Sequence, residues 1–238
     1  MNGMTEDARK PVIAIDGPAG AGKSTIAARL ARKLGYVNLE SGAMYRALGL
    51  KAVEGDVSLD DEAALLKLAQ NSRITLEPKL DGNRVLLNGR DVSDRIREPD
   101  VTAAASRVSV HPAVRVWMVE HQREMGAGGG IIMEGRDIGT KVFPDAEVKV
   151  FLEAAPEVRV ERRLKQELAD PERFGQVAAE LRERDDRDRS RAVSPLEPAP
   201  DAIIVDSSSM TIDEVVSTIE RVIAEKMAST GHQAKTPE

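Results

Sequence analysis

The sequence predicts an α/β fold of three layers, in which helices cover both faces of a central parallel sheet. Short apolar segments alternate along the chain with longer segments of helical periodicity, and strands that alternate with helices form parallel sheets of this kind. The first apolar segment also leads directly into a glycine-rich turn and then into an amphipathic helix. At 238 residues the chain is long enough to bury a substantial core.

The predicted strands share short length, apolar composition and flanking turn residues. They lie at residues 12–15, 74–76, 85–87, 131–133, 148–152 and 202–205. The pair at 74–76 and 85–87 is separated by Asp81, Gly82 and Asn83, and turn residues of this type join antiparallel strands. We therefore expect a small antiparallel meander, inserted in a chain whose other strands are parallel.

The predicted helices share an apolar stripe at helical spacing. They lie at residues 23–34, at about 43–54, from near Ser58 to Leu68, at 101–108, from Val114 to Met125, at 156–168, in the charged segment that ends at 183–189, and from Thr211 to about residue 227. Gly35 ends the first helix, as glycine commonly does. The pairs Ser58–Asp61 and Thr211–Glu214 have capping-box spacing at two helix starts.

Composition excludes several classes of protein. The formal net charge of -6 argues against a polymeric nucleic-acid partner. Arginines nevertheless concentrate between Arg159 and Arg191, and a local basic patch fits a small phosphorylated ligand. The absence of cysteine excludes disulfides and thiolate sites. No apolar run approaches the ~20 residues that cross a bilayer, and the first ten residues lack a secretory signal, so we expect a cytoplasmic protein without a membrane partner.

The glycine-rich turn GPAGAGKS at residues 17–24 matches the phosphate-binding pattern G-x-x-x-x-G-K-[ST]. Glycines let the backbone direct its N–H groups at phosphate, and the following helix adds its positive end. Lys23 would reach the β- and γ-phosphates, and the Ser24 hydroxyl would bind Mg²⁺. The alternative is a glycine-rich hairpin with a solvated lysine, but the position between a buried strand and an amphipathic helix favours a nucleotide site.

Two charged clusters are candidates for the same site. Glu134 to Asp137 follow the strand at 131–133, and ligands of open α/β sheets bind outside the carboxyl ends of strands. The second cluster is the segment from Arg182 to Arg191, whose arginines could lie over bound phosphates. Taken alone, the first is equally typical of a solvated turn, and the second of an exposed helix with many salt bridges.

At these clusters the sequence resembles the bacterial cytidylate kinase family. The resemblance rests on segments that occur in the family's order: IAIDGPAGAGKST, SGAMYRA, TAAASRVS, EGRDIGT, VFPDAEVKVFL and ERDDRDRSRAVSPL. It covers about residues 12 to 225. It implies a P-loop NTPase fold and a nucleoside-monophosphate kinase that uses ATP and Mg²⁺ to phosphorylate CMP and dCMP by direct in-line transfer.

The resemblance also implies a set of site residues. ATP would be held by Gly17, Pro18, Ala19, Gly20, Ala21, Gly22, Lys23, Ser24 and Thr25. The acceptor site would be formed by Ser41, Tyr45, Arg46, Ser106, Arg115, Arg136, Asp137, Arg184, Asp188 and Arg191. The transfer would depend on Lys23, Arg136, Arg184 and Arg191, and the metal on Ser24, Asp16 and Glu134.

Within the acceptor set the roles differ. The CMP phosphate would be gripped by Arg46 and Arg136, and the ribose by Asp188. The cytosine would be read by Ser106, Arg115 and Asp137. A carboxylate, a guanidinium and a hydroxyl complement the amine, ring nitrogen and carbonyl of this base.

The predicted domain organisation follows the same resemblance. A kinase domain at 11–227 would consist of a core (11–67, 102–155 and 192–227), an acceptor-binding insert (about 68–101) and a helical lid (about 156–191). The segments 1–10 and 228–238 would be flexible tails. No extended exposed apolar helix indicates a partner, so we expect a monomer.

Three other functions remain open at this point. A kinase for shikimate or another monophosphate would share the loop, but would not need Ser106, Arg115 and Asp137 together. A GTP-dependent switch would carry an Asn-Lys-x-Asp segment, which the sequence lacks. A single-stranded nucleic-acid binder would need stacking aromatics, and aromatic residues make up only 3% of this chain.

Overall fold

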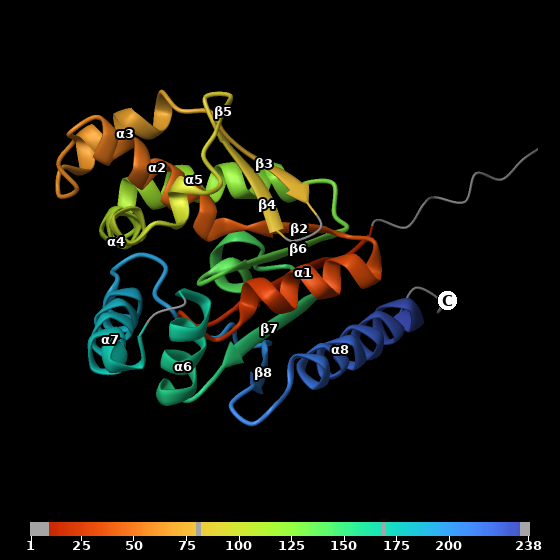
Figure 1. Cartoon of the computed structure of the whole chain (residues 1–238). Coiled ribbons are helices and arrows are strands. Elements are labelled where there is room, and N and C mark those ends of the chain that lie inside the picture. The colour runs from red at the N-terminus through yellow and green to blue at the C-terminus, as the bar shows by residue number, and fades with distance from the viewer. Residues whose placement is uncertain (1–9, 80–81, 168–169, 234–238) are drawn as a thin grey trace, which may run out of the picture.

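The structure is a computed structural model that describes residues 10–79, 82–167 and 170–233. Its centre is a five-stranded parallel sheet in the order β2-β6-β1-β7-β8 (Figure 1). These strands are β1 Val12–Asp16, β2 Val37–Glu40, β6 Ile131–Gly135, β7 Val148–Glu153 and β8 Ile203–Asp206. The sheet with its helices has the three-layer α/β arrangement that the sequence predicted.

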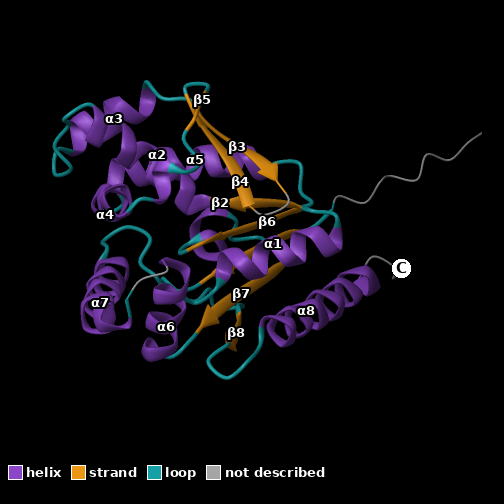
Figure 2. Ribbon diagram, viewed as in Figure 1, coloured by secondary structure: helices purple, strands orange, loops and turns teal. Residues whose placement is uncertain are grey.

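Helices cover both faces of this sheet (Figure 2). The α-helices of the described residues are α1 Lys23–Leu34, α2 Ser41–Glu54, α3 Glu62–Gln70, α4 Pro99–Val108, α5 Pro112–Gly126, α6 Pro156–Glu167, α7 Phe174–Ser190 and α8 Ile212–Gln233. Short helical turns lie at η1 Arg95–Arg97, η2 Ile138–Val142 and η3 Pro171–Arg173. None of the helices within the described ranges is both long enough and apolar enough to cross a membrane.

Two apolar cores lie on opposite faces of the sheet, because successive strand residues point to opposite sides. Ile13 of β1 packs with α1 and α8 on one face. Ala14, the next residue, packs with α2 and α5 on the other. All five residues of β1 are buried, as expected for the middle strand of a parallel sheet covered on both faces.

Helix α1 has the bounds that its apolar stripe predicts. Ile26, Ala27 and Leu30 are buried on its inner face. Gly35 follows the last turn with φ 64° and donates its N–H to Ala31 O, a left-handed helix end that glycine adopts without a steric cost.

Helices α2 and α4 approach each other closely at Gly49. A Cβ atom at this position would lie 2.9 Å from the backbone nitrogen of Ala105. Only glycine allows this separation between α2 and the backbone of α4 at Ala104 and Ala105.

The small antiparallel sheet confirms the predicted meander. It consists of β3 Ile74–Lys79, β4 Gly82–Leu87 and β5 Arg90–Asp91. Asn88 and Gly89 form the turn before β5 with φ 52° and 84°. The predicted turn residue Asp81 lies outside the described residues.

Strand β2 was not predicted from the sequence. Its sequence VNLE lacks an apolar run, and its polar residues are buried through contacts made far along the chain. The side chain of Asn83 in β4 accepts a hydrogen bond from Glu40 N (2.9 Å) and donates one to Asn38 O (2.8 Å). These bonds satisfy polar groups that would otherwise disfavour a buried strand.

Two predictions at helix ends were wrong. The cap of α3 is Asp61, whose carboxylate accepts from Ala64 N at 3.0 Å; the Ser58 hydroxyl instead accepts from Asp60 N. Helix α8 continues to Gln233 rather than ending near residue 227, because a helix already formed can extend through exposed turns without an apolar face. The predicted capping box of Thr211 and Glu214 is confirmed by reciprocal hydrogen bonds.

Candidate active site

The loop at residues 17–24 connects β1 to α1, as the motif requires. Gly17 has φ 146°, and a Cβ atom there would lie 2.0 Å from Leu152 O, so the loop passes directly over the end of β7. Lys23 opens α1, and its Nζ donates to Pro18 O at 2.8 Å, across the loop. The lysine is therefore folded over the residues expected to surround phosphate.

Lys23 is 5% exposed and lies among other charged groups. Burial and the nearby positive charge of Arg136 lower the pKa of Lys23 to about 7, although the Glu134 carboxylate favours its charged form. Polyanionic phosphate would have the opposite effect on this pKa, because an adjacent negative charge stabilises the ammonium.

Glu134, at the carboxyl end of β6, contacts both predicted sides of the site. Its Oε1 accepts a hydrogen bond from Ser24 Oγ at 2.8 Å, and its backbone oxygen accepts one from Ser41 Oγ at 2.7 Å. Burial raises the pKa of Glu134 above its ordinary value, although Lys23 acts in the opposite direction. The predicted phosphate loop and the start of α2 therefore meet at this residue.

Asp16, the third predicted metal ligand, makes two backbone contacts. Its oxygens accept from Ile138 N at 2.9 Å and Gly139 N at 2.7 Å. Burial raises the pKa of Asp16 to about 7, although both N–H donors oppose that rise. These bonds hold the segment immediately after Asp137 against the end of β1.

The residues predicted to read the base form a buried group. Arg115 is 1% exposed, and its Nη2 pairs with Asp137 Oδ2 at 2.5 Å. Its guanidinium carbon lies 5.5 Å from the centre of the Tyr45 ring. The hydroxyl of Ser106 accepts a hydrogen bond from Arg187 of α7. The Asp137 carboxylate and the Arg115 guanidinium therefore meet directly, whereas the Ser106 hydroxyl is bound by Arg187.

The arginines predicted to bind phosphate are also brought to the site. Arg136 Nε donates to Asp188 Oδ2 at 2.9 Å, and Arg191 lies 3.4 Å from the other oxygen of that carboxylate. Arg46 pairs with Glu40 at the end of β2. Burial, and then the charge of Arg136, lower the pKa of Arg184 to about 10.

Several of these guanidinium groups have buried nitrogens without a hydrogen-bond partner among the described residues. The atoms are Arg46 Nε, Arg115 Nε, Arg184 Nε and Arg191 Nη2. A buried donor without an acceptor is costly, and guanidinium donors match phosphate and carbonyl oxygens. The arrangement suits an anionic ligand with several oxygen acceptors.

Sequence reasoning missed some residues that complete the site. Glu40 receives Arg46 and lies 3.6 Å from Arg97. Burial raises the pKa of Glu40, but the charges of Arg46 and Arg97 outweigh burial and hold it below its ordinary value. Glu40 could have been found only from its position at the end of strand β2, and the sequence analysis did not predict that strand. Arg187 lies in the arginine-rich segment, and no feature of the sequence distinguished it from the neighbouring arginines.

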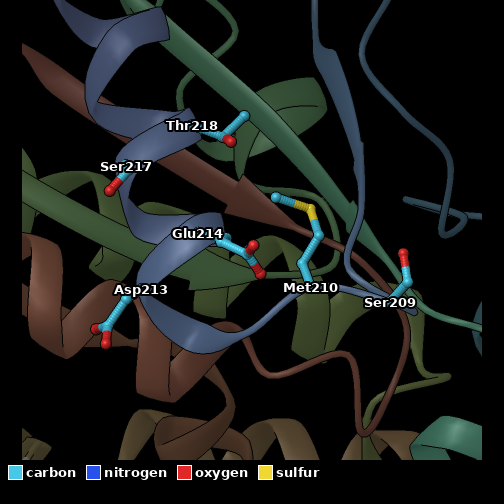
Figure 3. Close-up of a pocket in the computed structure, with 6 residues that line it drawn as sticks. All are labelled: Ser209, Met210, Asp213, Glu214, Ser217 and Thr218. Carbon is cyan, nitrogen blue, oxygen red and sulfur yellow. The ribbon is translucent and has the colours of Figure 1, made fainter.

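A separate hollow lies at the start of α8 (Figure 3). It is lined by Ser209, Met210, Asp213, Glu214, Ser217 and Thr218. None of these is a predicted site residue, and the phosphate loop does not contribute to the lining. The site described above is therefore distinct from this hollow.

The comparisons with known proteins agree with this geometry. The family model described as cytidylate kinase matches residues 13–225. The chain belongs to the cytidylate kinase family. This range contains every segment on which the resemblance was based.

Individual relatives extend over nearly the whole chain. The cytidylate kinase of Aeromonas salmonicida is 51% identical over 212 residues, which cover 88% of this chain and 92% of the relative. That of Pelotomaculum thermopropionicum is 51% identical over 213 residues, 88% and 94% of the two chains. The cytidylate kinase of Geobacillus kaustophilus is 47% identical over 221 residues, which cover 92% of this chain and 99% of the relative. This member of the cytidylate kinase family therefore spans nearly the full length of these relatives.

Proposed function

We propose that this chain transfers the terminal phosphoryl group of ATP to CMP, and also to dCMP. The observation that carries the proposal is the buried Arg115–Asp137 pair, which lies near Tyr45 and Arg191. Asp188 joins Arg191 to Arg136, whose charge acts on Lys23 of the phosphate loop. A base reader and a polyphosphate site occupy the same edge of the sheet, as a kinase for a nucleoside monophosphate requires. Membership of the cytidylate kinase family supports the choice of cytosine.

The transfer itself needs positioning and charge neutralisation rather than a covalent enzyme intermediate. The CMP phosphate is already an anionic nucleophile, so no general base is required. Arg46 and Arg136 would hold this phosphate, while Lys23, Arg184 and Arg191 would neutralise the charge that spreads over the equatorial oxygens of the transferred group. Buried nitrogens of Arg46, Arg184 and Arg191 that have no hydrogen-bond partner among the described residues are available for such oxygens.

Cytosine would be selected by hydrogen bonding. Asp137 would accept from the exocyclic amine, with Arg115 and Ser106 directed at the remaining edge of the base. The keto oxygen of UMP would face the Asp137 carboxylate instead, and each buried group left unpaired costs about 1–3 kcal/mol. Asp188, held by Arg136 and Arg191, would bind the ribose.

Ser24 and Glu134 fit a magnesium ion because they present a hydroxyl and a carboxylate oxygen 2.8 Å apart beside Lys23. Mg²⁺ prefers oxygen ligands and is commonly bound through one or two protein groups together with substrate phosphates. When bound, the ion would neutralise phosphate charge. Asp16 stays a predicted ligand whose two oxygens also hold the backbone at Ile138 and Gly139.

We propose the division into core, acceptor-binding insert and lid that the family resemblance implies. The arginine-bearing helices α6 and α7 would form the lid at about 156–191 and exclude water, which would otherwise consume ATP. We further propose that the protein works as a monomer in the cytoplasm.

The proposal is tested by measuring ADP release with CMP, dCMP, UMP and AMP as separate acceptors. We expect rapid release with CMP and dCMP and much slower release with UMP and AMP. Consumption of ATP at the same rate with and without CMP would contradict the proposal. Preference for GTP, with slow hydrolysis and no acceptor, would indicate a switch protein instead.

The role of Lys23 gives a second test. Lys23→Ala removes the positive charge nearest the expected γ-phosphate, and loss of one preorganised charge lowers turnover by about 10²–10³-fold. Steady-state kinetics with saturating CMP would measure this, and circular dichroism would check that the fold is intact. Near-normal turnover in the folded variant would refute the role.

A further inference from the structure

Helix α6 contacts the phosphate loop through Arg159. This side chain is 7% exposed, and its Nη1 donates to Ala19 O at 3.0 Å. The same nitrogen pairs with Asp185 Oδ2 of α7 at 2.5 Å. Arg159 therefore joins the loop to the second helix of the proposed lid.

A second arginine of α6 makes a parallel contact one turn further on. Arg162 Nη1 donates to Ala21 O at 3.2 Å and to Ser207 Oγ at 3.0 Å, and its Nη2 donates to Ser207 O at 2.7 Å. The carbonyls of alternate loop residues, Ala19 and Ala21, are thus both held by guanidinium groups from the same helix.

Because the peptide bond is planar, the contacts of the Ala19 and Ala21 carbonyls also fix the direction of the N–H groups that follow them. In a planar trans peptide the C=O of one residue and the N–H of the next point in opposite directions. A carbonyl of Ala19 directed at α6 therefore turns the N–H of Gly20 away from it, and the carbonyl of Ala21 does the same for Gly22. None of the described residues accepts a hydrogen bond from either N–H.

We infer that Arg159 and Arg162 are positioning residues that orient the phosphate loop by holding its outward carbonyls, so that the N–H groups of Gly20 and Gly22 face the nucleotide phosphates. The inference rests on the proposed binding of ATP at residues 17–25. Phosphate binding by a loop requires N–H groups directed at the anion, and a backbone held from outside need not reorganise when the anion binds.

Close packing between the loop and α6 supports this arrangement. A Cβ atom on Gly20 would lie 3.1 Å from both Cβ and the carbonyl oxygen of Arg159. Gly20 has φ +76°, a conformation that favours glycine. The loop therefore lies directly on α6, where Arg159 and Arg162 can fix its orientation.

The test compares variants that remove each contact. Arg162→Gln leaves no buried carboxylate unpaired. Arg159 is replaced together with its partner, as Arg159→Gln/Asp185→Asn, because removing the arginine alone would leave Asp185 buried and unpaired. The matched control is Arg123→Gln, whose guanidinium binds the backbone oxygens of Lys141 and Val142 in η2.

Two measurements separate orientation of the loop from general stability. In steady-state kinetics we expect the KM for ATP to rise about tenfold in both test variants while the KM for CMP stays within about twofold. In ¹⁵N-resolved NMR, titration with ADP should change the amide chemical shifts of Gly20 and Gly22 less in these variants than in the wild type. Arg123→Gln should resemble the wild type in both measurements.

The outcomes distinguish this inference from the proposed function. Wild-type affinity for ADP and wild-type glycine shifts in folded Arg162→Gln would overturn the orienting role, while the proposed function would stand. Equal rises in the KM for ATP and for CMP would also overturn it. A wild-type protein that does not bind ADP would overturn both. If circular dichroism shows that the double variant is unfolded, the Arg162→Gln variant alone decides the question.

Discussion

Individual charged residues in this site are held mainly by partners that lie far away in the sequence. Arg115 pairs with Asp137, Arg136 with Asp188, and the partner of Ser24 is Glu134. The charged members of these pairs are buried or partly buried, where an unpaired charge is costly. Changes at single residues should therefore affect stability as well as activity.

Asp137→Asn should destabilise the protein strongly. The substitution leaves the guanidinium of Arg115 buried without its counter-charge, which costs about 3–5 kcal/mol in comparable buried pairs. Urea unfolding measures the loss. Glu54→Gln is the matched control, because it breaks the exposed pair of Glu54 and Arg90, and exposed pairs contribute about 0–1 kcal/mol. Equal effects of the two substitutions would contradict the importance of burial.

Asp188 should make stability depend on acid pH. Burial raises its pKa, but the charges of Arg136 and Arg191 outweigh burial and hold the pKa below the ordinary value of an aspartate. The native state then releases this proton at lower pH than the unfolded chain, so the contribution is present above about pH 4 and is lost as the pH falls through the folded pKa.

The corresponding measurement is urea unfolding of wild type and Asp188→Asn between pH 3 and pH 7. We expect the difference in free energy of unfolding to be largest near pH 7 and to shrink toward pH 3. Taking the difference between wild type and variant cancels the pH-dependent contributions of the other carboxylates to the free energy of unfolding. A difference that is constant over this range would show that Asp188 does not gain stability from ionisation.

At the scale of elements, the carboxyl ends of the strands determine where the chemistry lies. The pairing of Glu40 with Glu134, and of Asp16 with Gly135, aligns the ends of β2, β6 and β1. The register of the parallel sheet thus brings together charged residues from segments that are far apart in the sequence. Helix caps, by contrast, are decided within a few residues.

The cap of α3 can be tested directly. Asp61→Ala removes the carboxylate that accepts from Ala64 N and should lower the free energy of unfolding by about 1 kcal/mol. Ser58→Ala, at the position that the sequence favoured, should change it by less than about 0.5 kcal/mol. Thermal unfolding of both variants provides the comparison. A larger effect at Ser58 would restore the original assignment.

For the whole molecule, two cores on opposite faces of one sheet account for most of the buried apolar side chains. The large apolar side chains left exposed among the described residues are Val37, Val53, Val116, Phe174, Ile204, Ile212 and Met227. They are distributed over different elements, and scattered exposed apolar residues are ordinary on monomeric proteins.

We therefore expect a monomer in solution. Light scattering coupled to size exclusion should give a mass near 25.8 kDa at micromolar concentration, with and without ADP. A mass near twice this value would contradict the prediction. Variants at the exposed apolar residues would then locate the interface.

The phosphate loop, the alternation of strands and helices, and the family could all be predicted from the sequence. These features are encoded in contiguous residues: Gly17 to Ser24 contain the whole loop motif, and α1 shows its stripe and its terminal glycine in one segment. Local geometry and periodicity are sufficient to predict such elements, because the interactions that form them act over a few residues.

Which charged residues pair with one another depends on how distant elements pack. Strand β2 could not be predicted, since its burial depends on Asn83 in another sheet. The pairing of Glu40 with Arg46, and the contact of Arg159 with the phosphate loop, were hidden for a related reason. An arginine in a charged segment looks the same whether it is solvated or buried, and only the packing of distant elements determines its partner.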